Sequence, residues 1–119
     1  MAVDAELNER LRAALDGIPC ISEKPMMGAT CFFHHGNMLG GADRSKTGER
    51  RFLFRVGPEG TAKALSRPGA RPAERGARVM RGFVFVDPES CDARALEGWI
   101  DLAMDYVWAL PAKAQPLKI

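Results

Sequence analysis

Five residues of this chain have side chains suited to metal binding or thiol chemistry, namely Cys20, Cys31, His34, His35 and Cys91. The cysteines are an odd number without a Cys-x-x-Cys pair, which predicts reduced thiols and not a disulfide framework. His34 and His35 are adjacent in a predicted strand, so their side chains point to opposite faces and do not share one metal ion. Cys31 and His35 share a face but lie about 13 Å apart along an extended strand, too far for one zinc ion. We therefore expect no bound metal.

Covalent catalysis would require a histidine to activate one of the cysteines, and such partners need not be close in sequence. The residues around the cysteines match no nucleophile motif, and two histidines offer few partners. The carboxylates mostly occupy predicted helix faces, where solvation is their ordinary role. We therefore predict a protein that is not an enzyme, with no catalytic residue and no cofactor.

The net charge of +2 hides an uneven distribution along the chain. Segment 44–81 contains eleven basic and three acidic residues, a balance of +8, whereas segments 1–43 and 82–119 each balance at −3. A basic middle indicates either a weak nucleic-acid contact involving Arg50 and Arg51, or a sheet face and loops whose charge is offset by acidic helices nearby. Both interpretations stay open at the level of the sequence.

Residues 81–86, RGFVFV, resemble the strand of RNA-recognition domains whose aromatic side chains stack on bases. The pattern fits at Arg81, Gly82, Phe83 and Phe85. It fails at Val84, where a small residue is expected, and at Pro88, where an aromatic residue is expected. An RNA-recognition fold also needs a strand after its second helix, and only PAKAQPLKI follows here. RNA recognition by this strand is therefore an alternative and not the leading interpretation.

Two segments have the periodicity of amphipathic helices. Residues 4–16 place Leu7, Leu11 and Leu15 on one face, and Gly17 ends that helix. Residues 92–110 form the longest predicted helix, which ends before Pro111.

Between these helices the pattern predicts strands. A hairpin joins strands 27–35 and 38–42 through a turn at Gly36-Asn37, and strands follow at 51–56 and 78–86. A short helix over 61–66 and an irregular connection over 67–77 separate the last two strands. The sequence therefore predicts one α+β domain over residues 1–119, with a small antiparallel sheet and N- and C-terminal helices packed on one face.

The predicted C-terminal helix is apolar over an arc of about 260°, more than a helix lying on a sheet needs. We expect the N-terminal helix to cover the flank that carries Leu102. The other flank carries Met104 and Trp108, and tryptophan is favoured at interfaces because it buries a large area with few rotatable bonds. We therefore predict a homodimer or protein-partner contact at Met104 and Trp108.

The first residues, MAVDAELNERLRAALDG, lack the cationic start and apolar run of a signal peptide. No apolar stretch reaches the roughly 20 residues that cross a bilayer. We expect a cytoplasmic protein without membrane contact.

Five segments, in order, resemble the TfoX N-terminal domain family, also called TfoX/Sxy. They are Met26-Met27-Gly28 with FFHHGNM, then RFLFRVGPEGTAKAL, RPGARP, VMRGFVFVDPE and LEGWIDLAMDYVWALPAK, and they cover about residues 20–113. The resemblance implies an α+β domain with a small antiparallel sheet. It also implies structural roles for the recurring positions Met27, Gly28, Gly36, Gly82 and Trp99.

The best-known members of this family are bacterial regulators of natural competence, and they carry a second domain that we expect this chain, ending at Ile119, to lack. The family has no established catalytic residues. The leading prediction is therefore a non-enzymatic regulatory or protein-interaction domain. The alternatives are a weak nucleic-acid-binding domain, favoured if the basic residues form one contiguous patch, and a small-molecule-binding or enzymatic domain, favoured by a deep apolar pocket with convergent polar groups.

Overall fold

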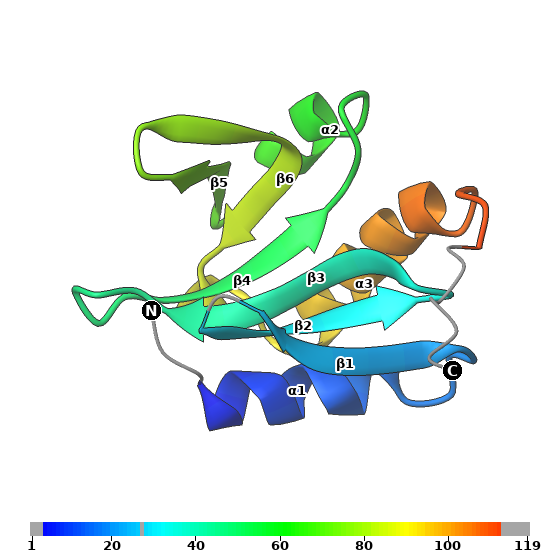
Figure 1. The fold of residues 1–119 in the computed structure, drawn as a ribbon. Coiled ribbons are helices and arrows are strands. Elements are labelled where there is room, and N and C mark those ends of the chain that lie inside the picture. Colours follow the sequence, from blue (N-terminus) through cyan, green and yellow to red (C-terminus); the bar gives the residue numbers. More distant parts are fainter. Residues whose placement is uncertain (1–3, 27, 113–119) are drawn as a thin grey trace, which may run out of the picture.

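The computed structural model describes residues 4–26 and 28–112, which form a six-stranded antiparallel sheet with helices on one side (Figure 1). The strand order is β1-β2-β3-β4-β6-β5. The elements are α1 (Ala5–Leu15), β1 (Ile21–Met26), β2 (Ala29–His34), β3 (Asn37–Arg44), β4 (Arg50–Arg55), α2 (Thr61–Leu65), β5 (Ala70–Arg75), β6 (Arg78–Val86), the 3₁₀ turn η1 (Pro88–Ser90) and α3 (Ala93–Val107). The α+β fold with terminal helices on an antiparallel sheet is confirmed.

The hydrophobic core lies between the sheet and the helices α1 and α3, which contact each other and the central strand β3. The strands contribute Phe32, Phe52 and Phe54, and α1 contributes Leu7, all at most 1% exposed. Helix α2 lies on the same side, because Arg67 just after it donates to the Gly98 carbonyl of α3 (3.0 Å). Leu102 is buried in this core, as expected for its flank of α3.

Two strands were not predicted, and both are edge strands of the sheet. Strand β1 is exposed at five of its six residues, and β5 has only Ala73 buried. An edge strand that buries little need not alternate polar and apolar residues, so periodicity does not reveal it. Each also contains a proline, Pro25 or Pro72, which is tolerated in a strand chiefly at a sheet edge.

The β2–β3 hairpin turns at His35 and Gly36, one residue earlier than predicted. Both residues have positive φ, +49° and +80°, as a two-residue type I′ turn requires. Asn37 instead begins β3 and pairs with His34. The register of β2 and β3 shifts between Phe33 and Phe32, and β3 ends at Arg44. Of the predicted strand 27–35, β2 occupies Ala29–His34, and Met27 lies outside the described residues.

Candidate functional site

The sheet face turned away from the helices is concave and largely apolar. Because side chains alternate along a strand, the inward-pointing Phe52 and Phe54 place Leu53 on this opposite face. Cys31 of β2 and Phe85 of β6 also lie there, yet they are only 5% and 6% exposed, although none of the described helices covers this face. Another part of the sheet must shield them.

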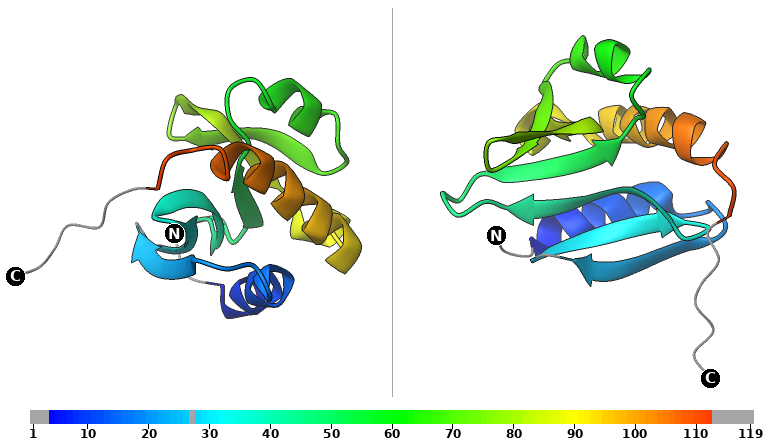
Figure 2. Two further views of the ribbon diagram at one scale, coloured as in Figure 1. Left: turned by 90° about the vertical axis from the view of Figure 1, so that its right-hand side faces the viewer. Right: turned by 45° about the horizontal axis from the view of Figure 1, so that its top comes forward.

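The shielding comes from the β5–β6 hairpin. Strand β6 pairs with β4 only over 83–86, whereas its pairing with β5 continues back to Arg78. The far part of this hairpin therefore extends beyond β4 as a two-stranded arm, and the left view of Figure 2 shows the sheet bent between its β1–β2 end and its β5–β6 end. The two ends form the walls of one pocket, which we call the groove.

The groove has a volume of about 270 Å³. Its apolar lining comes from five strands and includes Met26, Ala29, Cys31, Met38, Leu53 and Met80. Three of the six methionines of the chain thus lie on its walls. Methionine is flexible and polarizable, and it is common on surfaces that bind apolar partners of varied shape.

A largely buried ion pair crosses the floor of the groove. Asp43 and Arg51 face each other on β3 and β4, and Arg51 Nε donates to Asp43 Oδ1 (2.8 Å) with a second contact of 3.3 Å to Oδ2. The guanidinium of Arg51 also lies 4.2 Å from the centre of the Phe85 ring. The two opposite charges compensate each other in a place where either alone would be costly to bury.

One end of the groove opens into a second, basic pocket of about 600 Å³, which we call the basic mouth. It lies between the loop after β3 and the β5–β6 arm, and it is lined by Lys46, Arg71 and Arg75. Arg51 and Phe85 line both pockets, so the two adjoin. Arg71 forms an ion pair with Glu49 and lies 5.4 Å from the centre of the Phe85 ring.

The lining of the groove includes one thiol, that of Cys31. Burial raises the pKa of the Cys31 thiol, and the Asp43 carboxylate raises it further, so the thiol stays neutral and is a poor nucleophile. Residues 4–26 and 28–112 contain no group of three or more side chains placed to hold a metal ion. The absence of a metal and of catalysis stays a prediction.

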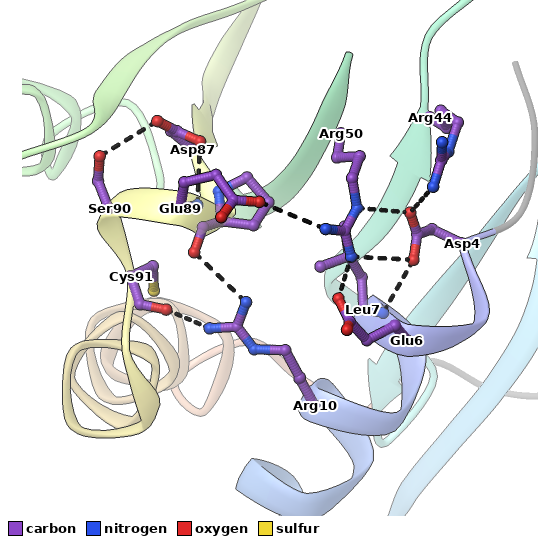
Figure 3. A network of polar contacts seen from close by, with 11 residues as sticks. Asp4, Glu6, Leu7, Arg10, Arg44, Arg50, Asp87, Glu89, Ser90 and Cys91 are labelled. Atoms are coloured by element: carbon purple, nitrogen blue, oxygen red, sulfur yellow. Dashed lines mark hydrogen bonds and ion pairs between the residues drawn. The ribbon is translucent and has the colours of Figure 1, made fainter. Parts of the chain in front are cut away.

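Arg50, one of the two predicted nucleic-acid contacts, is engaged on the helix side of the sheet (Figure 3). Its guanidinium contacts Asp4 (2.9 Å), Glu6 and Glu89 (3.3 Å). Burial raises the pKa of Asp4, but hydrogen bonds from Arg50, the Leu7 amide and Arg44 outweigh it and lower that pKa to about 2. Asp4 and Glu6, at the start of α1, thus offset part of the basic segment, as the second charge interpretation expected.

Arg50 and Arg51 therefore point to opposite faces of β4, because they are neighbours in a strand. Arg44 and Arg50 pair with Asp4 on the helix side of the sheet, whereas Lys46, Arg51, Arg71 and Arg75 gather on the other side around the basic mouth. Nucleic-acid contact through Arg50 and Arg51 stays a prediction, and both side chains already have carboxylate partners.

The RNA-recognition-like strand places Phe83 and Phe85 on the helix-free face, as that motif requires. However, Phe85 is 6% exposed, and the guanidinium groups of Arg51 and Arg71 lie over its ring. A base cannot stack on Phe85 without displacing them. The geometry therefore disfavours RNA binding by this strand.

The predicted interface residues differ in exposure. Trp108, at the end of α3, is 64% exposed, whereas Met104 is partly buried and packs against the core. The Trp108 ring stacks on His34, with the ring centres 5.1 Å apart. The prediction of a contact here stays open, centred on Trp108.

The two histidines do not have the strand geometry predicted for them. His35 lies in the turn and not in a strand, so strand alternation does not separate it from His34. Their ring centres are in fact 4.5 Å apart. The His34 imidazole is 3% exposed, and its Nε2 has no hydrogen-bond partner among the described residues.

Sequence reasoning missed the groove, although a signal was present. The runs Phe52-Leu53-Phe54 and Val84-Phe85-Val86 are apolar at consecutive positions, which indicates strands buried on both faces. The methionines gave no such signal, because they come from separate strands.

Together, the fold and this surface define a small α+β domain with one helix-covered sheet face and one apolar, concave face. The chain belongs to the TfoX N-terminal domain family, whose sequence pattern matches residues 13–107. No curated protein is similar enough to count as a match.

The fold also resembles a crystal structure of a protein from Pseudomonas syringae, determined as a structural genomics target. The TM-score is 0.63 at 12% sequence identity, over 83% of this chain and 97% of that one. At this identity the likeness concerns the fold alone. No helix within the described part of the chain is long and apolar enough to cross a membrane.

Proposed function

We propose that this domain is a non-enzymatic interaction module of the cytoplasm that binds a regulatory protein partner through the groove. The observation that carries the proposal is an apolar, methionine-walled groove on a sheet face that no described helix covers. A regulatory role agrees with the competence regulators that share this domain family.

A small-molecule site is the main competing function, and two features of the groove disfavour it. Its volume of about 270 Å³ lies at the lower limit for such sites, which hold about 300 to 1,000 Å³. A small-molecule site also needs polar groups that are available to orient the ligand. Here two of the four charged side chains that line the groove, those of Asp43 and Arg51, are already bonded to each other.

Two neighbouring residues of the arm provide a matched test. Met80 lines the groove, whereas Val79 is 59% exposed and does not line it. Partners are captured from an extract of the source organism and quantified by mass spectrometry. We expect the wild type and Val79→Glu to capture the same partners and Met80→Glu to lose them. Circular dichroism would check that both variants are folded. Equal capture by both variants would contradict binding through the groove.

A further inference from the structure

The edges of the sheet restrict how a partner can reach this domain. An extended peptide adds to a sheet through the unpaired backbone groups of an edge strand. Both edge strands, β1 and β5, contain a proline, which lacks the N–H that such pairing uses. Lys24 and Glu74 add charges to the same two edge strands, a further feature that discourages strand addition. A partner that uses the groove therefore approaches the sheet face and not its edge.

The groove suits a few anchoring side chains on a rigid element. A volume of about 270 Å³ can hold several apolar side chains but not a whole helix or strand. The backbone of the partner must then lie along the rim of the groove. An amphipathic helix presents such anchors at positions i, i+3 or i+4, and i+7. Met26, Met38 and Met80, on three different strands, can adjust to anchors of different shape.

The charges around the groove indicate what charge the partner carries. The charged side chains that line the groove and the basic mouth are four basic ones, from Lys46, Arg51, Arg71 and Arg75, and two acidic ones, from Asp43 and Glu74, a balance of +2. The bases are concentrated at the basic mouth, and Lys46 forms no ion pair within the part of the chain that the structure describes. By contrast, the exposed charged side chains of α3, on the other side of the sheet, are Arg94, Glu97, Asp101 and Asp105, a balance of −2.

We infer that the partner presents an amphipathic α-helix whose apolar face enters the groove and whose carboxylates meet the basic mouth. This inference rests on the proposed function of the groove. The apolar anchors supply the affinity, and the carboxylates fix the direction in which the helix lies and accelerate its association.

Selection from a displayed library of helical 16-residue peptides against the wild-type protein tests the inference. We expect enriched peptides to carry Leu, Met or Phe at helical spacing with Asp or Glu at one end. A synthetic copy should become helical on binding by circular dichroism and should lose affinity for Met80→Glu but not for Val79→Glu.

Charge variants test the electrostatic part. Lys46→Glu should weaken binding about fivefold at low salt and less at high salt, because the contact is exposed and screened. Lys63→Glu, on the exposed side of α2, is the matched control and should leave the affinity unchanged.

The outcomes separate the inference from the proposed function. Enriched peptides that are basic, or extended and proline-rich, but still sensitive to Met80→Glu would overturn the helix and leave the groove as the binding surface. A library that yields no helical binder would also overturn it. Binders unaffected by Met80→Glu would overturn the proposed function itself.

Discussion

At the scale of single residues, Asp4 joins parts of the fold that are far apart in sequence. Its carboxylate caps α1 through the Leu7 amide (3.1 Å) and accepts hydrogen bonds from Arg44 and Arg50 on β3 and β4. Asp4 is 4% exposed, so these partners replace the water that an exposed carboxylate would bind. The ion pairs of Asp4 with Arg44 and Arg50 hold the start of α1 against the sheet.

We expect Asp4→Asn to destabilise the protein by about 2 kcal/mol at pH 7, because the folded state lowers the pKa of Asp4 from 3.8 to about 2. Asparagine still caps a helix, so the substitution isolates the charge. The stabilisation is present above pH 3.8 and is lost as the pH falls through about 2, so the difference between wild type and variant should shrink over this range and vanish below it. Urea unfolding at several pH values measures it. Glu9→Gln, in an exposed ion pair, is the control and should change stability by less than about 1 kcal/mol.

His34 predicts a second pH dependence. Burial lowers its pKa, and the nearby His35 lowers it further, so the folded state favours the neutral ring. The unfolded state binds more protons below pH 6.5, and stability should therefore fall as the pH drops below 6.5. His34→Phe keeps a ring beneath Trp108 without a titrating group, and thermal unfolding should show a smaller loss for this variant between pH 7 and 5. An equal loss in both proteins would assign the effect to other groups.

At the scale of elements, α3 is apolar on more sides than its packing requires. Leu96, Ile100 and Ala103 lie in the core, and contact with α1 covers a further part of the helix. The end of α3 is fixed by the hydrogen bond from Asn37 Nδ2 to the Pro111 carbonyl (2.9 Å). Trp108 is left exposed beside this junction.

We expect Trp108 to mediate self-association, because an exposed tryptophan held in place by a ring stack presents a large apolar area with little entropy to lose. Sedimentation velocity at high protein concentration should show a dimer for wild type and a monomer for Trp108→Glu. Val79→Glu, which also replaces an exposed apolar residue, should behave like wild type. A wild-type monomer at the highest concentration would contradict the prediction.

At the scale of the whole molecule, the sheet separates charge as well as polarity. Arg44 and Arg50 pair with Asp4 at the start of α1, whereas Arg51, Arg71 and Arg75 surround the groove and its basic mouth. The charge of segment 44–81 is thus spread over two surfaces, and carboxylates offset part of it on each.

We expect any binding to DNA or RNA to be weak, with a dissociation constant of about 10⁻⁴ to 10⁻⁶ M at physiological salt, and independent of sequence. Binding would release counterions from the nucleic acid, so the affinity should fall steeply as the salt concentration rises. Fluorescence anisotropy with labelled duplexes of unrelated sequence at 50 and 200 mM salt measures this. Sequence-specific binding that survives high salt would contradict the prediction and support the RNA-recognition alternative.

The sequence alone determined the elements whose signals are local. Strand β6 was predicted with its observed bounds, and both long helices were predicted to within three residues, because a buried face imposes a period on the residues that form it. The fold class and the family followed from these elements and from five ordered segments. The edge strands β1 and β5 were missed because they bury almost nothing.

Only the tertiary structure decided the features on which the proposed function rests. The groove collects residues from all six strands, and strand order with the bend of the sheet brings them together. The role of each basic residue also depends on the fold: Arg50 and Arg51 are adjacent in sequence, yet one ties α1 to the sheet and the other forms the floor of the groove. Which face of a strand meets a helix is set by packing across the chain, and no local pattern encodes it.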